Sequence, residues 1–166
     1  MHRLIFLSCF LAFSILGSAQ NMTNKKMEKI LKAEAEKIEG KLGLWTVTYA
    51  STPLLIITDE RANRMRIFTF VTDEKSIEGE HVKKMLQANF HSALDAKYAM
   101  QDGYVVSIFT HPLKELTEEQ FLDAMKQVVM LAFTFGTTYT STEWVFGGGA
   151  EEEKKEEKPV KKEKKL

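Results

Sequence analysis

The chain has 166 residues, with 23 Lys and Arg against 23 Asp and Glu, one cysteine and a hydrophobic fraction of 44%. This length suits one domain with short appendages, and the composition excludes a wholly disordered chain. The formal net charge of zero argues against a nucleic-acid-binding protein, because such proteins concentrate basic residues on one face.

Residues 1–19 are predicted to be a signal peptide. The basic start at Arg3 precedes an apolar run from Leu4 to Leu16, and Gly17-Ser18-Ala19 offers the small residues that a signal peptidase recognises. Because the run is too short to span a membrane, we expect cleavage after Ala19, export to the periplasm or the medium, and no stable membrane span afterwards. A retained anchor is the alternative. Cys9 lies in the leader, so the mature chain is expected to have no thiol.

The first half of the mature chain is predicted to contain one helix and three strands. Apolar residues recur at helical spacing over 25–39, before Gly40 and Gly43. Strands are expected over 44–50, 54–58 and 65–71. In the first of them, Trp45 and Val47 alternate with threonines, as in a half-buried strand. The short connections predict an antiparallel meander.

The second half is predicted to add a helix, a hairpin and a last helix. The helix is expected over 80–94, where Val82, Leu86 and Phe90 are spaced i, i+4 and i+8. Asp102-Gly103 between two apolar runs, 96–101 and 104–109, predicts a tight hairpin turn, because both turn positions require positive φ.

Thr117 and Gln120 form a capping-box pattern that opens the last helix, expected to reach about residue 135. The second half of this helix is apolar on more than one side. It is therefore expected to lie in the core or against a second subunit, which makes a homodimer through this helix a hypothesis.

The predicted order is α-β-β-β-α-β-β-α, an α+β fold in which a three-stranded meander and a hairpin form one antiparallel sheet with helices packed on it. One domain is expected over residues 20–146. Within it, 137–146 is ambiguous between a last strand and a surface strap. Residues 147–166 begin with three glycines and continue almost entirely as Glu and Lys, which predicts a disordered tail. A solubilising role and a tether to anionic surfaces both remain open for the tail.

The sequence carries no motif for catalysis or for metal binding. His81, His91 and His111 form no His-x-x-x-His pair, and no serine lies in a nucleophile motif. We therefore predict no enzymatic activity, no metal and no cofactor. His111, which precedes a proline at a strand end, is the one histidine retained as a candidate.

Candidate binding residues lie at the third predicted strand and on the first. Arg64 and Arg66 alternate along the chain and either receive a carboxylate or phosphate group or protect a sheet surface or edge. Phe68, Phe70 and Trp45 are predicted as exposed aromatic contacts for a partner. These five residues form the predicted binding site.

A series of short motifs runs through the second half of the chain. In order they are Leu86-Gln87-Ala88-Asn89-Phe90, Ala96-Lys97-Tyr98-Ala99, Asp102-Gly103, His111-Pro112-Leu113 and Leu116-Thr117-Glu118-Glu119. The series resembles the YbjN-type family, whose fold is similar to that of type III secretion chaperones, and the resemblance spans about residues 25–135. It implies a non-enzymatic, often dimeric domain that holds an extended peptide of a partner protein. The predicted export and the extension over 137–166 depart from the chaperone pattern.

Three functions follow from these observations. The preferred one is an exported, chaperone-like module that holds an extended segment of a partner polypeptide, by adding it as a strand at a free sheet edge. The alternative is a small-molecule or lipid carrier of the cell envelope, which requires an apolar pocket between sheet and helices. A hydrolase would require a catalytic constellation that the sequence lacks.

Overall fold

The structure is a computed structural model that describes residues 21–142. The predicted signal peptide over 1–19 and the predicted tail over 147–166 lie outside the described residues, as do both predicted domain boundaries. No helix within 21–142 is long and apolar enough to cross a membrane.

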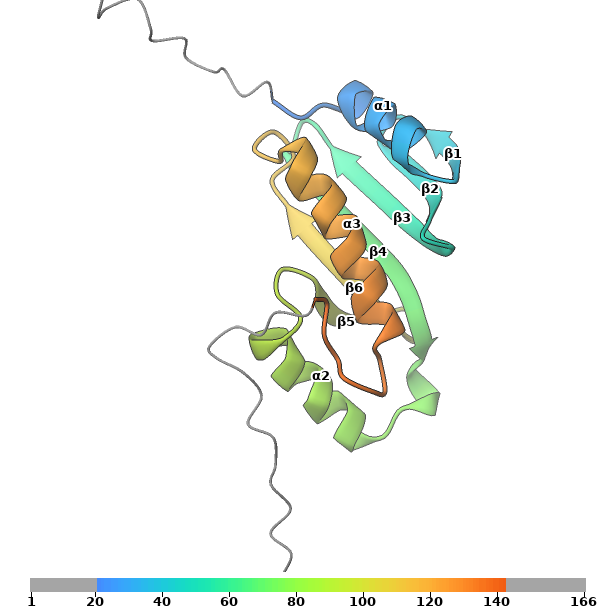
Figure 1. The fold of residues 1–166 in the computed structure, drawn as a ribbon, viewed down its shortest axis with the longest axis vertical. Helices are drawn as coiled ribbons and strands as arrows, with labels where there is room; N and C mark the ends of the chain where they lie inside the picture. Colours follow the sequence, from blue (N-terminus) through green and yellow to red (C-terminus); the bar gives the residue numbers. More distant parts are fainter. Residues whose placement is uncertain (1–20, 143–166) are drawn as a thin grey trace, which may run out of the picture.

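Three helices, one short 3-10 helix and a six-stranded antiparallel sheet make up the described chain (Figure 1). In chain order they are α1 (Asn24–Glu34), β1 (Lys37–Lys41), β2 (Leu44–Tyr49), β3 (Thr52–Asp59), β4 (Arg64–Asp73), η1 (Glu74–Ser76), α2 (Gly79–His91), β5 (Lys97–Gln101), β6 (Tyr104–His111) and α3 (Glu118–Phe133). The sheet order is β1-β2-β3-β4-β6-β5. The predicted α+β class is confirmed, with one more strand than expected.

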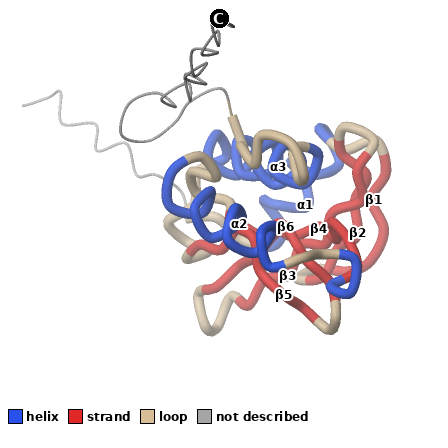
Figure 2. Tube along the Cα trace, turned by 90° about the horizontal axis from the view of Figure 1, so that it is seen from below, coloured by secondary structure: helices blue, strands red, loops and turns tan. Residues whose placement is uncertain are grey.

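The helices lie on one side of the sheet. Figure 2 shows α1 and α3 above the strands, and no helix of the described chain on the opposite side. Helix α3 packs against β4 and β6, whereas α2 packs against β5. We call the helix-covered side of the sheet the inner face and the other side the outer face.

The core fills the space between the inner face and the helices. Trp45, Ile56 and Ile67 lie side by side on β2, β3 and β4, because they are cross-strand partners. They are buried, together with Leu31 of α1 and Phe121 of α3. One cluster therefore joins sheet and helices, and the alternation of buried and exposed residues along the strands fixes which side chains reach the outer face.

The helix predicted over 25–39 was wrong in its last five residues. Helix α1 ends at Glu34, and residues Lys37–Lys41 form β1, which pairs with β2. Ala35 and Ile38 both pack against the core, so the helical spacing continues past the end of α1, although Ala35 is its extended C-cap and Ile38 lies in β1. Gly40 is incompatible with a continuing helix, since it adopts φ +112°. An added Cβ there would collide with the Leu44 carbonyl oxygen.

Two local predictions are confirmed. Thr117 Oγ1 accepts a hydrogen bond from the Gln120 amide at 3.1 Å, while Gln120 Oε1 accepts one from the Thr117 amide at 3.0 Å. Asp102 and Gly103 both have positive φ, as a tight hairpin turn between β5 and β6 requires. The ambiguous segment forms a strap of turns over 137–142, and residues 143–146 lie outside the described chain.

Tyr98 of β5 anchors that strap and is expected to make stability depend on alkaline pH. Its hydroxyl donates to the Leu131 carbonyl at 2.7 Å, and its ring packs edge-on against Phe135 and Tyr139. Burial raises the pKa of Tyr98 far above its ordinary value. In the unfolded chain this phenol ionises near pH 10. The stabilisation is therefore complete below about pH 10 and is lost as the pH rises further.

Urea unfolding followed from pH 8 to pH 11 tests this expectation. The free energy of unfolding of the wild type should fall more steeply above about pH 10 than that of Tyr98→Phe, which has no phenol to ionise at this position. Equal slopes for the two proteins would show that Tyr98 ionises as readily in the fold as in the unfolded chain.

Candidate functional site

The outer face of the sheet carries an apolar surface that no described helix covers. Cross-strand pairing brings Leu55, Phe68 and Ile108 into one row over β3, β4 and β6. The neighbouring rows contribute further apolar side chains on the same face. We call this set the outer strip: Leu55, Ile57, Phe68, Phe70, Tyr104 and Ile108.

Aromatic side chains form the most exposed part of the outer strip. Phe70 packs edge-on against Phe68 at a centroid distance of 5.9 Å and against Tyr104 at 5.4 Å. Val106, opposite Phe70, is buried although it does not belong to the core cluster, so the strip itself covers it. Phe70 is still 49% exposed. The uncovered face of an antiparallel sheet is usually polar, so an apolar strip there indicates an interaction surface.

The two predicted arginines differ in their surroundings. Arg66 lies within the outer face, between its cross-strand neighbours Ile57 and Thr110, and makes no hydrogen bond or ion pair with any residue of 21–142. Arg64 lies opposite Asp59 and donates to the Asn63 carbonyl at 2.9 Å. Strand β4 is flanked on both sides, so these arginines do not protect a sheet edge, while the interpretation that they protect a sheet surface stays open. Among the described residues, Arg66 is instead a cation without a partner, beside apolar side chains.

Trp45 was wrongly predicted to be an exposed contact. It is 1% exposed and lies on the inner face, opposite Ile56. Phe68 and Phe70 occupy outer-face positions. The structure therefore brings together four of the five predicted binding residues, Arg64, Arg66, Phe68 and Phe70, and assigns Trp45 to the core. Whether the four bind a partner stays a prediction.

The two edges of the sheet are not equally available for strand addition. On β5, the Asn89 side chain accepts a hydrogen bond from the Tyr98 amide at 2.7 Å and donates to the Tyr98 carbonyl at 3.1 Å. Gln127 Oε1 accepts from the Ala96 amide at 3.2 Å. Side-chain amides thus take the place of a neighbouring strand there. Edge strand β1 instead carries Lys37, which pairs with Glu39 at 2.7 Å.

Replacing Asn89 by alanine is expected to lower the free energy of unfolding by about 1–2 kcal/mol, because it leaves two partly buried peptide groups without partners. The Tyr98 amide should also exchange with deuterium faster. Gln87→Ala, an exposed change on the same helix, serves as the control. An unchanged Tyr98 exchange rate in Asn89→Ala would contradict the proposed protection of the β5 edge.

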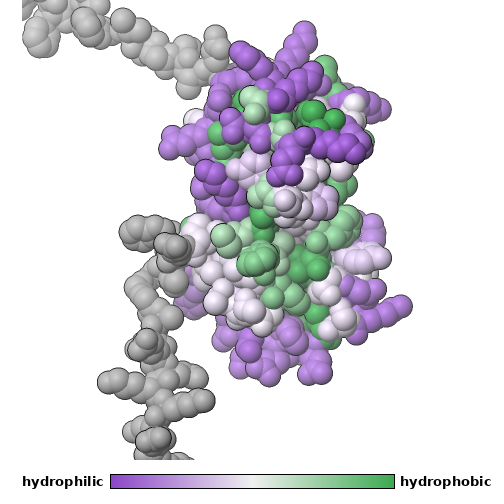
Figure 3. All heavy atoms as spheres, turned by 45° about the vertical axis from the view of Figure 1, so that its right-hand side comes forward, coloured by the Kyte–Doolittle hydropathy of each residue, from purple (hydrophilic) through white to green (hydrophobic). Residues whose placement is uncertain are grey.

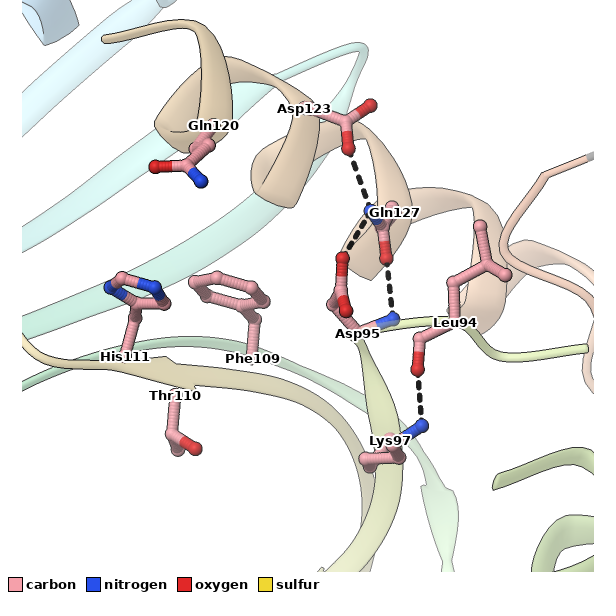
Figure 4. Close-up of a pocket in the computed structure, with 9 residues that line it drawn as sticks. All are labelled: Leu94, Asp95, Lys97, Phe109, Thr110, His111, Gln120, Asp123 and Gln127. Carbon is pink, nitrogen blue, oxygen red and sulfur yellow. Dashed lines mark hydrogen bonds between the residues drawn. The ribbon is translucent and has the colours of Figure 1, made fainter. Parts of the chain in front are cut away.

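A polar cleft of about 370 Å³ lies between the start of β5, the end of β6 and α3 (Figure 4). Its centre is Gln127, whose Nε2 donates to the Asp123 carboxylate at 2.7 Å and more weakly to Asp95. His111 stacks on Phe109, and its Nδ1 lies 2.7 Å from the Pro112 carbonyl oxygen. The cleft is lined mainly by polar side chains, which does not suit a lipid.

No group of three or more His, Cys, Asp and Glu side chains that could hold a metal ion occurs within residues 21–142. His81 caps the start of α2, because its Nδ1 accepts a hydrogen bond from the Glu78 amide at 3.4 Å. Its ring stacks on Phe135 at 5.8 Å. Within residues 21–142, His111 therefore belongs to no group of side chains that could hold a metal ion.

Helix α3 also exposes apolar residues. On α3, Val128 and Leu131 are buried, as predicted, but Phe133 is 84% exposed and Met130 is also exposed. A homodimer through this helix stays a prediction. Figure 3 shows hydrophobic residues gathered in the lower half of the molecule on the face in view, with hydrophilic residues around them.

No family model matches the chain, so the YbjN-type assignment is not confirmed, and no curated protein matches it either. Solved structures do share its fold. A chain of the HopA1–SchA chaperone–effector complex has a TM-score of 0.52 at 11% identity, over 68% of this chain and 94% of that chain.

Two further structures agree. A chain of the ExsC–ExsE complex has a TM-score of 0.51 at 12% identity, over 67% of this chain and 92% of that one. The third is the structure of the Yersinia pestis type III secretion chaperone SycH in complex with a stable fragment of YscM2. A chain of it has a TM-score of 0.51 at 16% identity, over 65% of this chain and 94% of that one. The chain thus has a fold like that of type III secretion chaperones.

Proposed function

We propose that this chain is a non-enzymatic, chaperone-like protein that binds an extended apolar segment of a partner polypeptide on the outer strip. The observation that carries the proposal is the exposed aromatic group of Phe68, Phe70 and Tyr104 on a sheet face that no described helix covers. Its fold, shared with chaperones whose structures contain bound partners, supports the same conclusion.

The chemistry of the strip indicates the chemistry of the partner segment. The strip crosses three adjacent strands, a width of roughly 10 Å between the outermost strand axes, which a few residues of extended chain can cover. Alternate side chains of such a segment point the same way, so apolar residues at every second position can contact the strip. Arg66 has no acidic partner within the described chain and favours a carboxylate on the bound segment. The proposed partner segment is therefore apolar and acidic.

Export is part of this proposal and rests on the predicted signal peptide over 1–19. N-terminal sequencing of the protein recovered from its producing cells tests it directly. A mature chain that begins at Gln20 is the expected result. An intact leader on the accumulated protein would remove export from the proposal, while the binding surface would be unaffected.

Binding to labelled peptides, measured by fluorescence anisotropy, tests the proposed activity. One peptide of about 12 residues alternates apolar and acidic residues, a second alternates apolar and basic residues, and a third has the first composition in shuffled order. The first is expected to bind saturably and more tightly than the other two, because only it matches both the strip and Arg66. Equal binding of all three, or binding of none, would contradict the proposal.

A further inference from the structure

Helix α2 turns an apolar stripe away from the core. Its buried residues are Met85 and Ala88, whereas Val82, Leu86 and Phe90 are all exposed. Leu86 is 64% and Phe90 80% exposed. We call these three residues the α2 stripe. Because exposed apolar stripes of this kind normally mark a contact surface, the question is what covers this one.

Grooves run along both sides of the α2 stripe. One of about 510 Å³ follows the helix itself and is lined by Val82, Leu86 and Phe90, with Lys83 at its rim. Another of about 430 Å³ lies between α2 and β5, where Met100 joins Val82 and Leu86. The stripe is therefore bordered by a wide, shallow groove along the helix and by a more enclosed one beside β5, and it has a polar rim.

The chain itself returns to one end of this stripe. The Ser141 amide donates to the Ser92 carbonyl at 3.1 Å, and the Ser141 hydroxyl donates to the Ala93 carbonyl at 2.7 Å. The Ser92 hydroxyl in turn donates to the Tyr139 carbonyl at 2.7 Å. Residue 141 is thus fixed at Ser92, just beyond the C-terminal end of α2. Ser92 is two residues after Phe90 in the chain.

The sequence beyond this anchor has the composition that the stripe requires. Glu143 is followed by Trp144, Val145 and Phe146, and three glycines come next. Five residues of extended chain reach about 17 Å, while the eight residues from Phe90 back to Val82 span about 12 Å of helix. The segment is therefore long enough to follow the stripe. Alternate side chains of extended chain point the same way, so Trp144 and Phe146 can both face the helix.

We propose that Trp144 and Phe146 of the same chain lie on the α2 stripe, with the segment antiparallel to the helix, and continue the strap that begins at residue 137. The contact is intramolecular and leaves the outer strip free. It is independent of the proposed function, because the two surfaces lie on different elements.

Tryptophan fluorescence of the full-length chain tests this contact. Trp45 and Trp144 are the two tryptophans, and in the background Trp45→Phe only Trp144 reports. We expect a blue-shifted emission and a quenching constant with acrylamide several-fold lower than that of free N-acetyltryptophanamide, at every protein concentration. Leu86→Glu should abolish this protection, whereas Leu42→Glu, an exposed apolar residue of the β1–β2 turn, should leave it unchanged.

The proposal would be overturned if Trp144 were quenched as freely as the model compound, or if Leu86→Glu had no effect. Loss of protection on dilution would also overturn it, because a second copy would then cover the stripe. A cysteine pair gives a measurement that does not depend on Trp45→Phe. In the background Cys9→Ser, Val82→Cys with Phe146→Cys should form an intramolecular disulfide, because residue 146 reaches the Val82 end of the stripe. No disulfide, or only intermolecular ones, would count against the contact.

Discussion

Replacing Trp45 by alanine is expected to lower the free energy of unfolding by about 3–5 kcal/mol, a large share of the stability of a domain of this size. The side chain is 1% exposed and packs between β2, β3 and the helices, so its removal leaves a cavity at the centre of the core. Urea unfolding followed by far-UV circular dichroism measures the loss. This result would establish that Trp45 serves the fold and is not a partner contact.

Trp45→Phe provides the matched control. The indole Nε1 has no hydrogen-bond partner in the described chain, so phenylalanine gives up little except volume. We expect this variant to lose much less stability than Trp45→Ala and to bind peptides as the wild type does. A stable Trp45→Ala protein with weakened peptide binding would contradict the assignment of Trp45 to the core.

Replacing both Phe68 and Phe70 by serine is expected to weaken binding of the apolar–acidic peptide by roughly tenfold or more, because buried aromatic residues dominate most binding surfaces. Phe70 is largely exposed and Phe68 partly so, and neither belongs to the core cluster. Thermal unfolding should therefore change little. Fluorescence anisotropy with the labelled peptide measures the affinity.

Phe133→Ser is the control for this pair, since Phe133 is exposed on α3, on the other side of the sheet. It should leave the affinity unchanged. Arg66→Glu adds a test of charge and should reverse the preference between the acidic and the basic peptide. Unaltered affinity in the double serine variant would show that the peptide binds elsewhere.

The patterns that rest on neighbouring residues were predicted correctly from the sequence. The capping box at Thr117 and the Asp102-Gly103 turn each depend on two residues close in the chain, and both are present. Strand alternation was also correct for residues 44–49. It placed Phe68 and Phe70 on one face, but alternation alone does not say which face the helices cover. Trp45 was misassigned for that reason.

The errors in the helices have a related cause. Ile38 fits a helical repeat extending from α1, and only its pairing with Val47 of β2 shows that it belongs to a strand. Similarly, the spacing of Val82, Leu86 and Phe90 correctly predicted a helix, but these residues are exposed and Met85 is buried. Hydrophobic spacing identifies an apolar face and does not identify what covers it.

Asn89 shows what sequence analysis of the candidate site missed. In the sequence it belongs to the short motif Leu86-Gln87-Ala88-Asn89-Phe90, which assigns it no role. In the structure its side chain occupies the two outward-facing peptide groups of Tyr98, nine residues away. A role that depends on how α2 lies beside β5 has no local signature. Because Asn89 occupies the β5 edge at Tyr98, a partner strand cannot pair with these groups, which favours the outer strip as the binding surface.

Mapping the bound peptide by amide chemical-shift perturbation is the most direct test of the outer strip as the binding surface. With the apolar–acidic peptide at saturation, the largest shifts are expected on β3, β4 and β6, centred on Phe68, Phe70 and Ile108, with smaller changes on α1 and α3. Shifts concentrated on α2, or on the polar cleft around Gln127, would place the partner elsewhere and contradict the account.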